Sequence, residues 1–72
     1  MDKQYLNRTQ INQRIKKLND WLIANPNDPM FGTVKVESLD YINLLGEIED
    51  KCLDVIENKV HTQIYQQIGN LL

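Results

Sequence analysis

Residues 31–55 of the chain read FGTVKVESLDYINLLGEIEDKCLDV. Within this stretch, positions spaced alternately by three and four residues are apolar with one exception. They are Phe31, Val34, Ser38, Tyr41, Leu45, Ile48, Cys52 and Val55. Such spacing is typical of the heptad seam of a helix that packs along another helix. We therefore expect a long helix here, with its apolar flank buried against a neighbour.

A first helix is predicted over residues 8–24. Asn7 can cap its start, with Gln10 in the capping-box position three residues later. Pro26 disfavours helical geometry in the residue before it, so the helix should end beside it. Its apolar residues fall on one face; they are Ile11, Ile15, Leu18 and Leu22, with Trp21 beside them.

Residues 25–28 read as a turn, and Asp28-Pro29 is typical of a helix start, with an aspartate cap and a proline in the first turn. The second helix is therefore predicted over residues 29–57. Residues 32–36 contain a glycine and three β-branched residues, which are poor helix formers. An extended loop there, with the helix starting near Ser38, remains an alternative.

After Val55 the apolar positions recur mostly every four residues, at Ile56, Val60, Ile64, Ile68 and Leu71. This step indicates either a stutter in one continuous helix or a break followed by a new helix. Neither proline nor glycine occurs between Glu47 and Ile68, and Asn58 is the favoured position for a break. We expect a C-terminal helix, or a continuation of the second helix, over residues 59–71.

The predicted fold is thus all-α, a single domain over residues 1–72 built on a helical hairpin. At ~1.5 Å per residue, the first helix spans roughly 25 Å and the second roughly 43 Å. The part of the long helix that the first helix cannot cover needs another neighbour. We expect a dimeric helix bundle, with an intramolecular three-helix bundle as the alternative.

The composition indicates a soluble cytoplasmic protein with no membrane partner. Apolar residues make up 42% of the chain, and no run approaches the ~18 residues of a membrane-spanning helix. The N-terminus lacks the apolar segment of a signal peptide. The single cysteine, Cys52, lies on the seam and is expected to be a buried, reduced thiol.

Charge is distributed unevenly, although the net charge is only −2. Residues 1–36 carry six basic against three acidic residues, whereas residues 37–57 carry seven acidic residues against Lys51. The two segments can neutralise each other, or the acidic face can dock a protein partner. The candidate partner-binding residues are Asp40, Glu47, Asp50 and Asp54. A basic face on the first helix, formed by Arg8, Arg14, Lys16 and Lys17, is the candidate for nucleic-acid binding, which its small size disfavours.

Catalytic and metal chemistry have little support in the sequence. Glu57 and His61 share a helical face, but a metal site needs three or four ligands. The glycines are isolated, so no phosphate-binding loop is present, and no nucleophile–base–orienter set can be assembled. We expect no enzymatic activity, no metal and no cofactor.

Residues 37–49, ESLDYINLLGEIE, resemble the second helix of an acyl carrier protein. In that family a serine opens an acidic helix and carries a 4′-phosphopantetheine arm, and Ser38 matches it. The resemblance implies an acyl pocket lined by Leu39, Ile42 and Ile48. It also implies a docking surface for basic enzymes formed by Asp40, Glu47, Glu49 and Asp50. Without such a role, Ser38 is a small polar residue in the seam or a helix cap.

The preferred interpretation is a small non-enzymatic, protein-binding regulator or inhibitor that acts by helix-mediated association. It is expected to associate with itself and with a protein partner. Small regulators of this kind include ones encoded by mobile elements. That this chain is one of them is a hypothesis that rests on no particular residue. The carrier protein and the nucleic-acid-binding regulator remain the alternatives.

Overall fold

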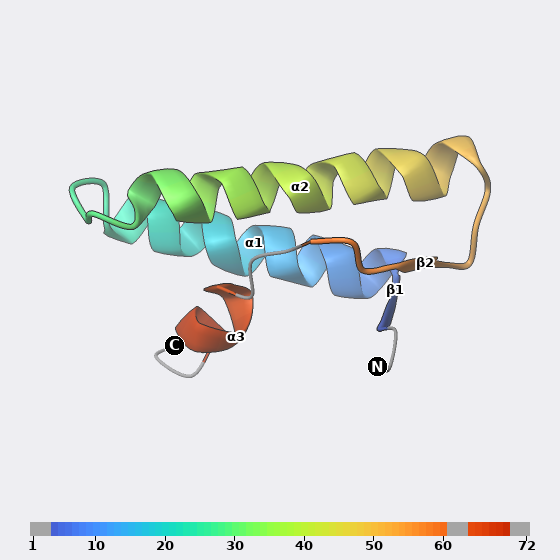
Figure 1. Ribbon diagram of the computed structural model, residues 1–72, viewed down its shortest axis with the longest axis horizontal. Coiled ribbons are helices and arrows are strands. Elements are labelled where there is room, and N and C mark those ends of the chain that lie inside the picture. Colours follow the sequence, from blue (N-terminus) through green and yellow to red (C-terminus); the bar gives the residue numbers. More distant parts are fainter. Residues whose placement is uncertain (1–3, 61–63, 70–72) are drawn as a thin grey trace.

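The computed structural model describes residues 4–60 and 64–69. Its elements in chain order are β1 (Tyr5–Asn7), α1 (Arg8–Ala24), α2 (Phe31–Asp50), β2 (Val55–Glu57) and α3 (Ile64–Gly69). The two long helices lie side by side as a hairpin, and the C-terminal segment returns along it to bring α3 against α1 (Figure 1). A mostly helical chain with two long helices is therefore confirmed, and the departure from a purely all-α fold is the small sheet that β1 and β2 form.

The start of α1 is set by a reciprocal pair of side-chain hydrogen bonds. The Asn7 side chain accepts from the Gln10 backbone N–H at 2.8 Å, and Gln10 Oε1 accepts from the Asn7 backbone N–H at 2.9 Å. Both donors belong to the first turn, where no intrahelical acceptor exists. The predicted capping box and the predicted helix over residues 8–24 are both confirmed.

The second helix begins at Phe31, two residues later than the predicted start at 29. Asp28 Oδ1 accepts from the Met30 backbone N–H at 2.8 Å, and the Asp28 carbonyl accepts from the Phe31 backbone N–H at 2.9 Å. Asp28 therefore closes a turn before the helix, so that Pro29 and Met30 belong to this turn. The poor helix formers of residues 32–36 are nevertheless helical.

The predicted end of this helix at residue 57 is wrong, because α2 ends at Asp50. Leu53 donates its backbone N–H to the Ile48 carbonyl at 2.9 Å, and Cys52 donates to the Glu49 carbonyl at 3.3 Å. This is the hydrogen-bond pattern of a Schellman motif, in which a left-handed residue closes the helix. The left-handed residue is Cys52, whose φ is 52°.

Beyond this turn the chain forms a strand where a helix was expected. β2 pairs antiparallel with β1 in the register Tyr5–Glu57, Leu6–Ile56 and Asn7–Val55. Residues 58–60 are also non-helical, so the helix expected over residues 59–71 is reduced to α3 among the residues that the structure describes. The apolar residues Ile56, Val60 and Ile64 were expected to lie on one face of a helix. They are all buried, but in a strand, in the segment after it and at the start of α3.

The core lies between the hairpin and the returning C-terminal segment. Its buried apolar residues are Leu6, Ile11, Leu18, Val34, Tyr41, Leu44, Ile48, Ile56, Val60 and Ile64. The seam is confirmed up to Ile48, with Phe31 and Leu45 half-buried. It is wrong for Cys52 and Val55, which are exposed because the turn after Asp50 carries them away from α1. None of the helices in the described part of the chain is long and apolar enough to cross a membrane.

Candidate protein-interaction surface

Helix α2 presents three faces, and two of them are covered by this chain. One face carries Val34, Ser38 and Tyr41, which are buried in the hairpin. A second face carries Glu37 and Leu44 and is covered by the C-terminal segment. At 100° per residue the third face points away from both neighbours. We call it the outer face, formed by Gly32, Lys35, Val36, Leu39, Ile42, Asn43 and Gly46, all exposed.

Three large apolar side chains occupy the middle of the outer face. Val36 is 55% exposed, Leu39 49% and Ile42 44%. Gly32 and Gly46 lie at the two ends, and a Cβ added at either position would meet no atom within 4 Å other than its chain neighbours and the adjacent backbone of its own helix. The helix backbone is thus open to close approach at both ends of an apolar stripe. Contiguous exposed apolar surface of this kind is typical of interaction sites.

The four acidic residues predicted to bind a partner do not form one continuous face. Asp40 is half-buried beside the C-terminal segment, and Asp50 lies exposed at the end of α2. Asp54 lies in the bend that precedes β2, beyond the helix altogether. Viewed down the helix axis, Asp50 projects in nearly the same direction as Leu39. It is therefore the member of this set that extends the outer face.

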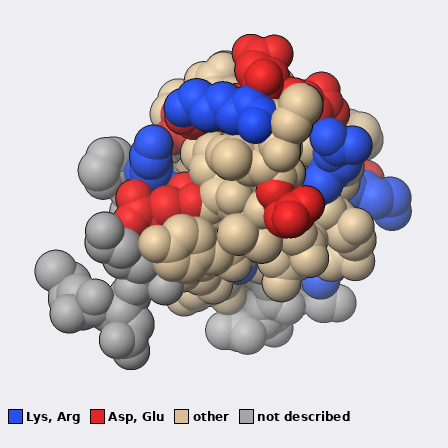
Figure 2. Space-filling view, turned by 90° about the vertical axis from the view of Figure 1, so that its right-hand side faces the viewer, with Lys and Arg blue, Asp and Glu red and all other residues tan. Residues whose placement is uncertain are grey.

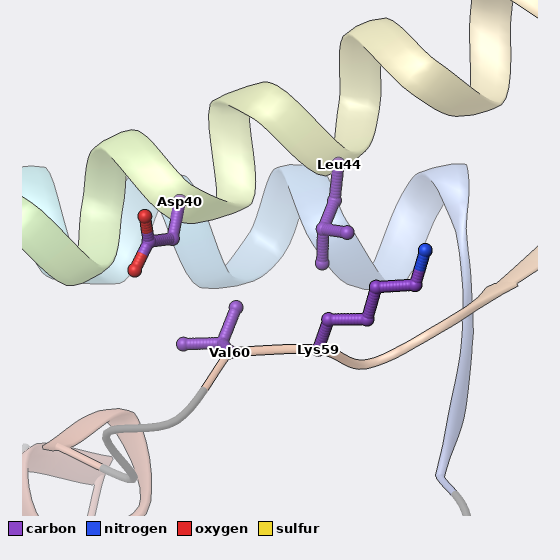
Figure 3. Close-up of a pocket in the computed structure, with 4 residues that line it drawn as sticks. All are labelled: Asp40, Leu44, Lys59 and Val60. Carbon is purple, nitrogen blue, oxygen red and sulfur yellow. The ribbon is translucent and has the colours of Figure 1, made fainter.

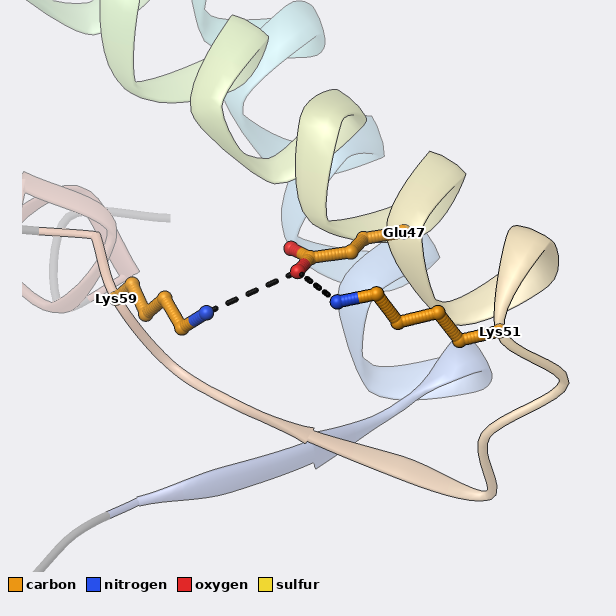
Figure 4. Close-up of polar contacts among 3 residues, drawn as sticks. All are labelled: Glu47, Lys51 and Lys59. Atoms are coloured by element: carbon orange, nitrogen blue, oxygen red, sulfur yellow. Dashed lines mark hydrogen bonds and ion pairs between the residues drawn. The ribbon is translucent and has the colours of Figure 1, made fainter.

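The fourth residue, Glu47, is engaged by two lysines of the same chain (Figure 4). Its Oε1 lies 2.9 Å from the Lys51 Nζ and 3.8 Å from the Lys59 Nζ. The hydrogen bond and the charge of Lys51, with the charge of Lys59, lower the pKa of Glu47. Lys59 follows β2, so this carboxylate also ties α2 to the returning segment.

We expect this network to make stability depend on pH. A lowered pKa in the folded state means that the stabilisation is complete at neutral pH and is lost as pH falls through that pKa. Glu47→Gln should therefore reduce the difference in unfolding free energy between about pH 7 and about pH 3. Urea unfolding at both pH values measures it, and about 1 M salt should shrink the effect in the parent protein. An unchanged difference would contradict this role.

A shallow pocket of about 160 Å³ lies between α2 and the C-terminal segment, lined by Asp40, Leu44, Lys59 and Val60. The Asp40 carboxylate and the Lys59 ammonium point to opposite ends of it, with the two apolar side chains between them (Figure 3). The two charges therefore do not converge on one bound group. Within the described residues, no group of three or more His, Cys, Asp or Glu side chains is arranged to hold a metal ion. His61 lies outside these residues.

The basic residues of α1 are largely engaged within the chain. Arg14 donates to the Tyr41 hydroxyl at 2.9 Å, and its guanidinium lies 4.7 Å from the centre of the Tyr65 ring. Lys17 lies 5.8 Å from the same ring. The remaining pairs are Arg8 with Glu49 at 4.0 Å and Lys16 with Asp20 at 3.7 Å. Arg14 and Lys17 thus help to hold α3 on the hairpin through cation–π contacts.

Ser38 is 3% exposed and lies well inside α2. Its hydroxyl donates to Asn19 Oδ1 at 3.0 Å, which links α2 to α1. The resemblance to a carrier protein implies a serine at the start of a helix, where a prosthetic arm can be attached. In this fold the hydroxyl faces the neighbouring helix, as expected of a small polar residue within the packing seam.

Glu37 is a structural residue that the sequence analysis did not single out. Its side chain is fully buried, and its two carboxylate oxygens accept from the backbone N–H groups of Ile64 at 2.9 Å and Tyr65 at 2.7 Å. These amides open α3 and have no acceptor within that helix. A signal was available, because Glu37 shares a helical face with Leu44 and Ile48.

The outer face of α2 is therefore the one large apolar surface of the hairpin helices that the described part of the chain leaves uncovered on consecutive turns. Lys35 lies at its N-terminal half, and acidic residues lie along its C-terminal half, including Glu49 and Asp50.

No protein-family model matches the sequence, no curated protein matches it, and no solved structure matches the fold.

Proposed function

We propose that this chain is a small protein-binding module that acts without catalysis. Its outer face docks an amphipathic helix of another protein, with cationic side chains flanking the apolar stripe of that helix. The observation that carries the proposal is the row of Val36, Leu39 and Ile42, each 44–55% exposed on successive turns of one helix. An amphipathic helix that packs its apolar face against another helix is a recurring mode of recognition, with anchors spaced by three and four residues.

Charge supports a cationic partner. Asp50 extends the outer face at the C-terminal end of α2, beside Glu47 and Glu49, whose carboxylates contact Lys51, Lys59 and Arg8 of the same chain. The helix dipole places partial negative charge at the same end, so acidic residues there are unfavourable. Cationic side chains from a partner would relieve this repulsion while apolar side chains cover the stripe. By occupying such a helix, the protein would regulate or inhibit the partner that carries it.

A matched pair of substitutions tests this proposal. We expect Leu39→Asp to weaken binding of a synthetic leucine–lysine amphipathic helix of about 20 residues by at least about tenfold. Ile23→Asp is the control, because Ile23 is 79% exposed on α1, away from the outer face. Neither change should alter stability by more than about 0.5 kcal/mol, since both sites are exposed. Fluorescence anisotropy of the labelled peptide measures the dissociation constants.

Equal weakening by both substitutions, or no binding by the parent protein, would refute the assignment of the outer face. Salt-dependent retention on duplex DNA in place of peptide binding would also refute it. That result would indicate that the basic residues of α1 form the binding surface.

A further inference from the structure

The turn that ends α2 is closed by a residue poorly suited to it. Cys52 has a φ of 52°, in the left-handed region, where side chains with a Cβ are disfavoured and glycine is the usual occupant. Lys51, Leu53 and Asp54, which surround it, are exposed. We call residues 51–54 the hinge. The hinge faces solvent at the end of the molecule where charged side chains of both signs surround an uncharged centre (Figure 2).

The sequence of the hinge is compatible with a continuous helix. It contains neither proline nor glycine, and Cys52 follows Ile48 by four residues and precedes Val55 by three. Were the hinge helical, Cys52 would continue the seam of α2, as the heptad spacing predicts. The sequence of the hinge therefore allows two backbone arrangements. One is a left-handed turn that reverses the chain, and the other is a straight helix that carries the chain onward.

The contacts made beyond the hinge do not require it to be bent. The β2 strand pairs with β1, and the side chains of Ile56, Val60 and Ile64 fill the core. Glu37 accepts from the first amides of α3, and Arg14 stacks on Tyr65. A second copy of the chain offers the same strand, the same core and the same carboxylate. Exchange of an identical element between two copies preserves all of these contacts.

We propose that two copies of this chain form a domain-swapped dimer by straightening the hinge. In the dimer, α2 continues through residues 51–54, and the β2 strand and α3 of each chain pack on the hairpin of the other. Glu37 of one copy then accepts from the α3 amides of its partner. Straightening removes the left-handed conformation at Cys52 and replaces the hydrogen bonds that Cys52 and Leu53 make in the turn by helical ones. The closed monomer keeps the advantage of an intramolecular contact, so the balance depends on concentration.

This inference goes beyond the proposed binding to another protein. The outer face of α2 stays on the surface in both forms, because the swap replaces each packed contact by the same contact from the other copy. Binding by the outer face and exchange at the hinge can therefore succeed or fail separately.

Two substitutions at one exposed position test the hinge. Cys52→Gly favours the left-handed turn and weakens the straight helix, whereas Cys52→Ala has the highest helix propensity. We expect the dimer dissociation constant of Cys52→Gly to exceed that of Cys52→Ala by at least about tenfold. Light scattering after size exclusion, over a series of concentrations, distinguishes the 8.5 kDa monomer from a particle of twice that mass.

A disulfide across the sheet then reports which chain supplies β2. Tyr5 and Glu57 are paired residues of β1 and β2, within the range over which a disulfide can form. Tyr5→Cys with Glu57→Cys, added to either Cys52 variant, leaves no other cysteine in the chain. We expect Cys52→Ala to yield covalent dimers on a non-reducing gel and Cys52→Gly to yield covalent monomers.

Two results would overturn the proposal. One is a Cys52→Ala protein that stays monomeric at every concentration. The other is a dimer whose disulfides join residues of the same chain, since that dimer would be built by surface contact without exchange.

Discussion

Ile48→Asp is expected to remove most of the stability of this protein and to abolish any association that depends on the fold. Ile48 is 1% exposed, in the core between the two long helices. A carboxylate there loses its hydration among apolar side chains, which costs about 4 to 5 kcal/mol or more. The whole free energy of unfolding of a 72-residue chain is roughly 4 to 11 kcal/mol. Far-UV circular dichroism and urea unfolding measure the loss.

The matched control is Ile42→Asp, the same substitution on the same helix at a side chain that is 44% exposed. We expect it to change the free energy of unfolding by no more than about 0.5 kcal/mol. Leu45→Asp should fall between the two, because Leu45 is half-buried. If Ile48→Asp kept its helical signal and its oligomeric state, the assignment of the buried seam would be wrong.

The second large effect is expected at Glu37. Glu37→Ala removes the carboxylate that accepts from two backbone N–H groups at the start of α3. Hydrogen bonds to a charged group contribute about 1.5 to 3 kcal/mol each. We expect a loss of about 3 kcal/mol, measured by urea unfolding. Hydrogen exchange at Ile64 and Tyr65 should accelerate by a larger factor than exchange within α1.

Two further variants separate the hydrogen bonds from the charge. Glu37→Gln keeps one carbonyl oxygen but turns an NH2 donor toward the second backbone N–H, so at most about half of the loss should return. Glu49→Ala removes an exposed carboxylate on the same helix, whose contact with Arg8 at 4.0 Å should contribute less than about 1 kcal/mol. A small effect of Glu37→Ala, equal to that of Glu49→Ala, would show that the buried carboxylate does not hold α3.

Local signals accounted for the hairpin because its ends are determined by neighbouring residues. Asn7 and Gln10 cap each other three residues apart, and Pro26 closes the first helix without help from the rest of the fold. The apolar spacing identified the flank of α2 that packs on α1. The same spacing could not identify the outer face, because Val36, Leu39 and Ile42 also recur at helical intervals on a helix that is apolar most of the way round.

The sequence alone thus determined the capped first helix, the turn after it, a second helix and the flank on which the two helices meet, since caps, proline and periodicity act over a few residues. Only the tertiary structure decided that α2 stops at Asp50, that β2 pairs with β1 and that Glu37 receives α3. The heptad spacing runs through Cys52 without interruption, and no local rule places a left-handed turn there. That turn is favoured because it returns Ile56, Val60 and Ile64 to a core whose other half lies about fifty residues earlier in the chain.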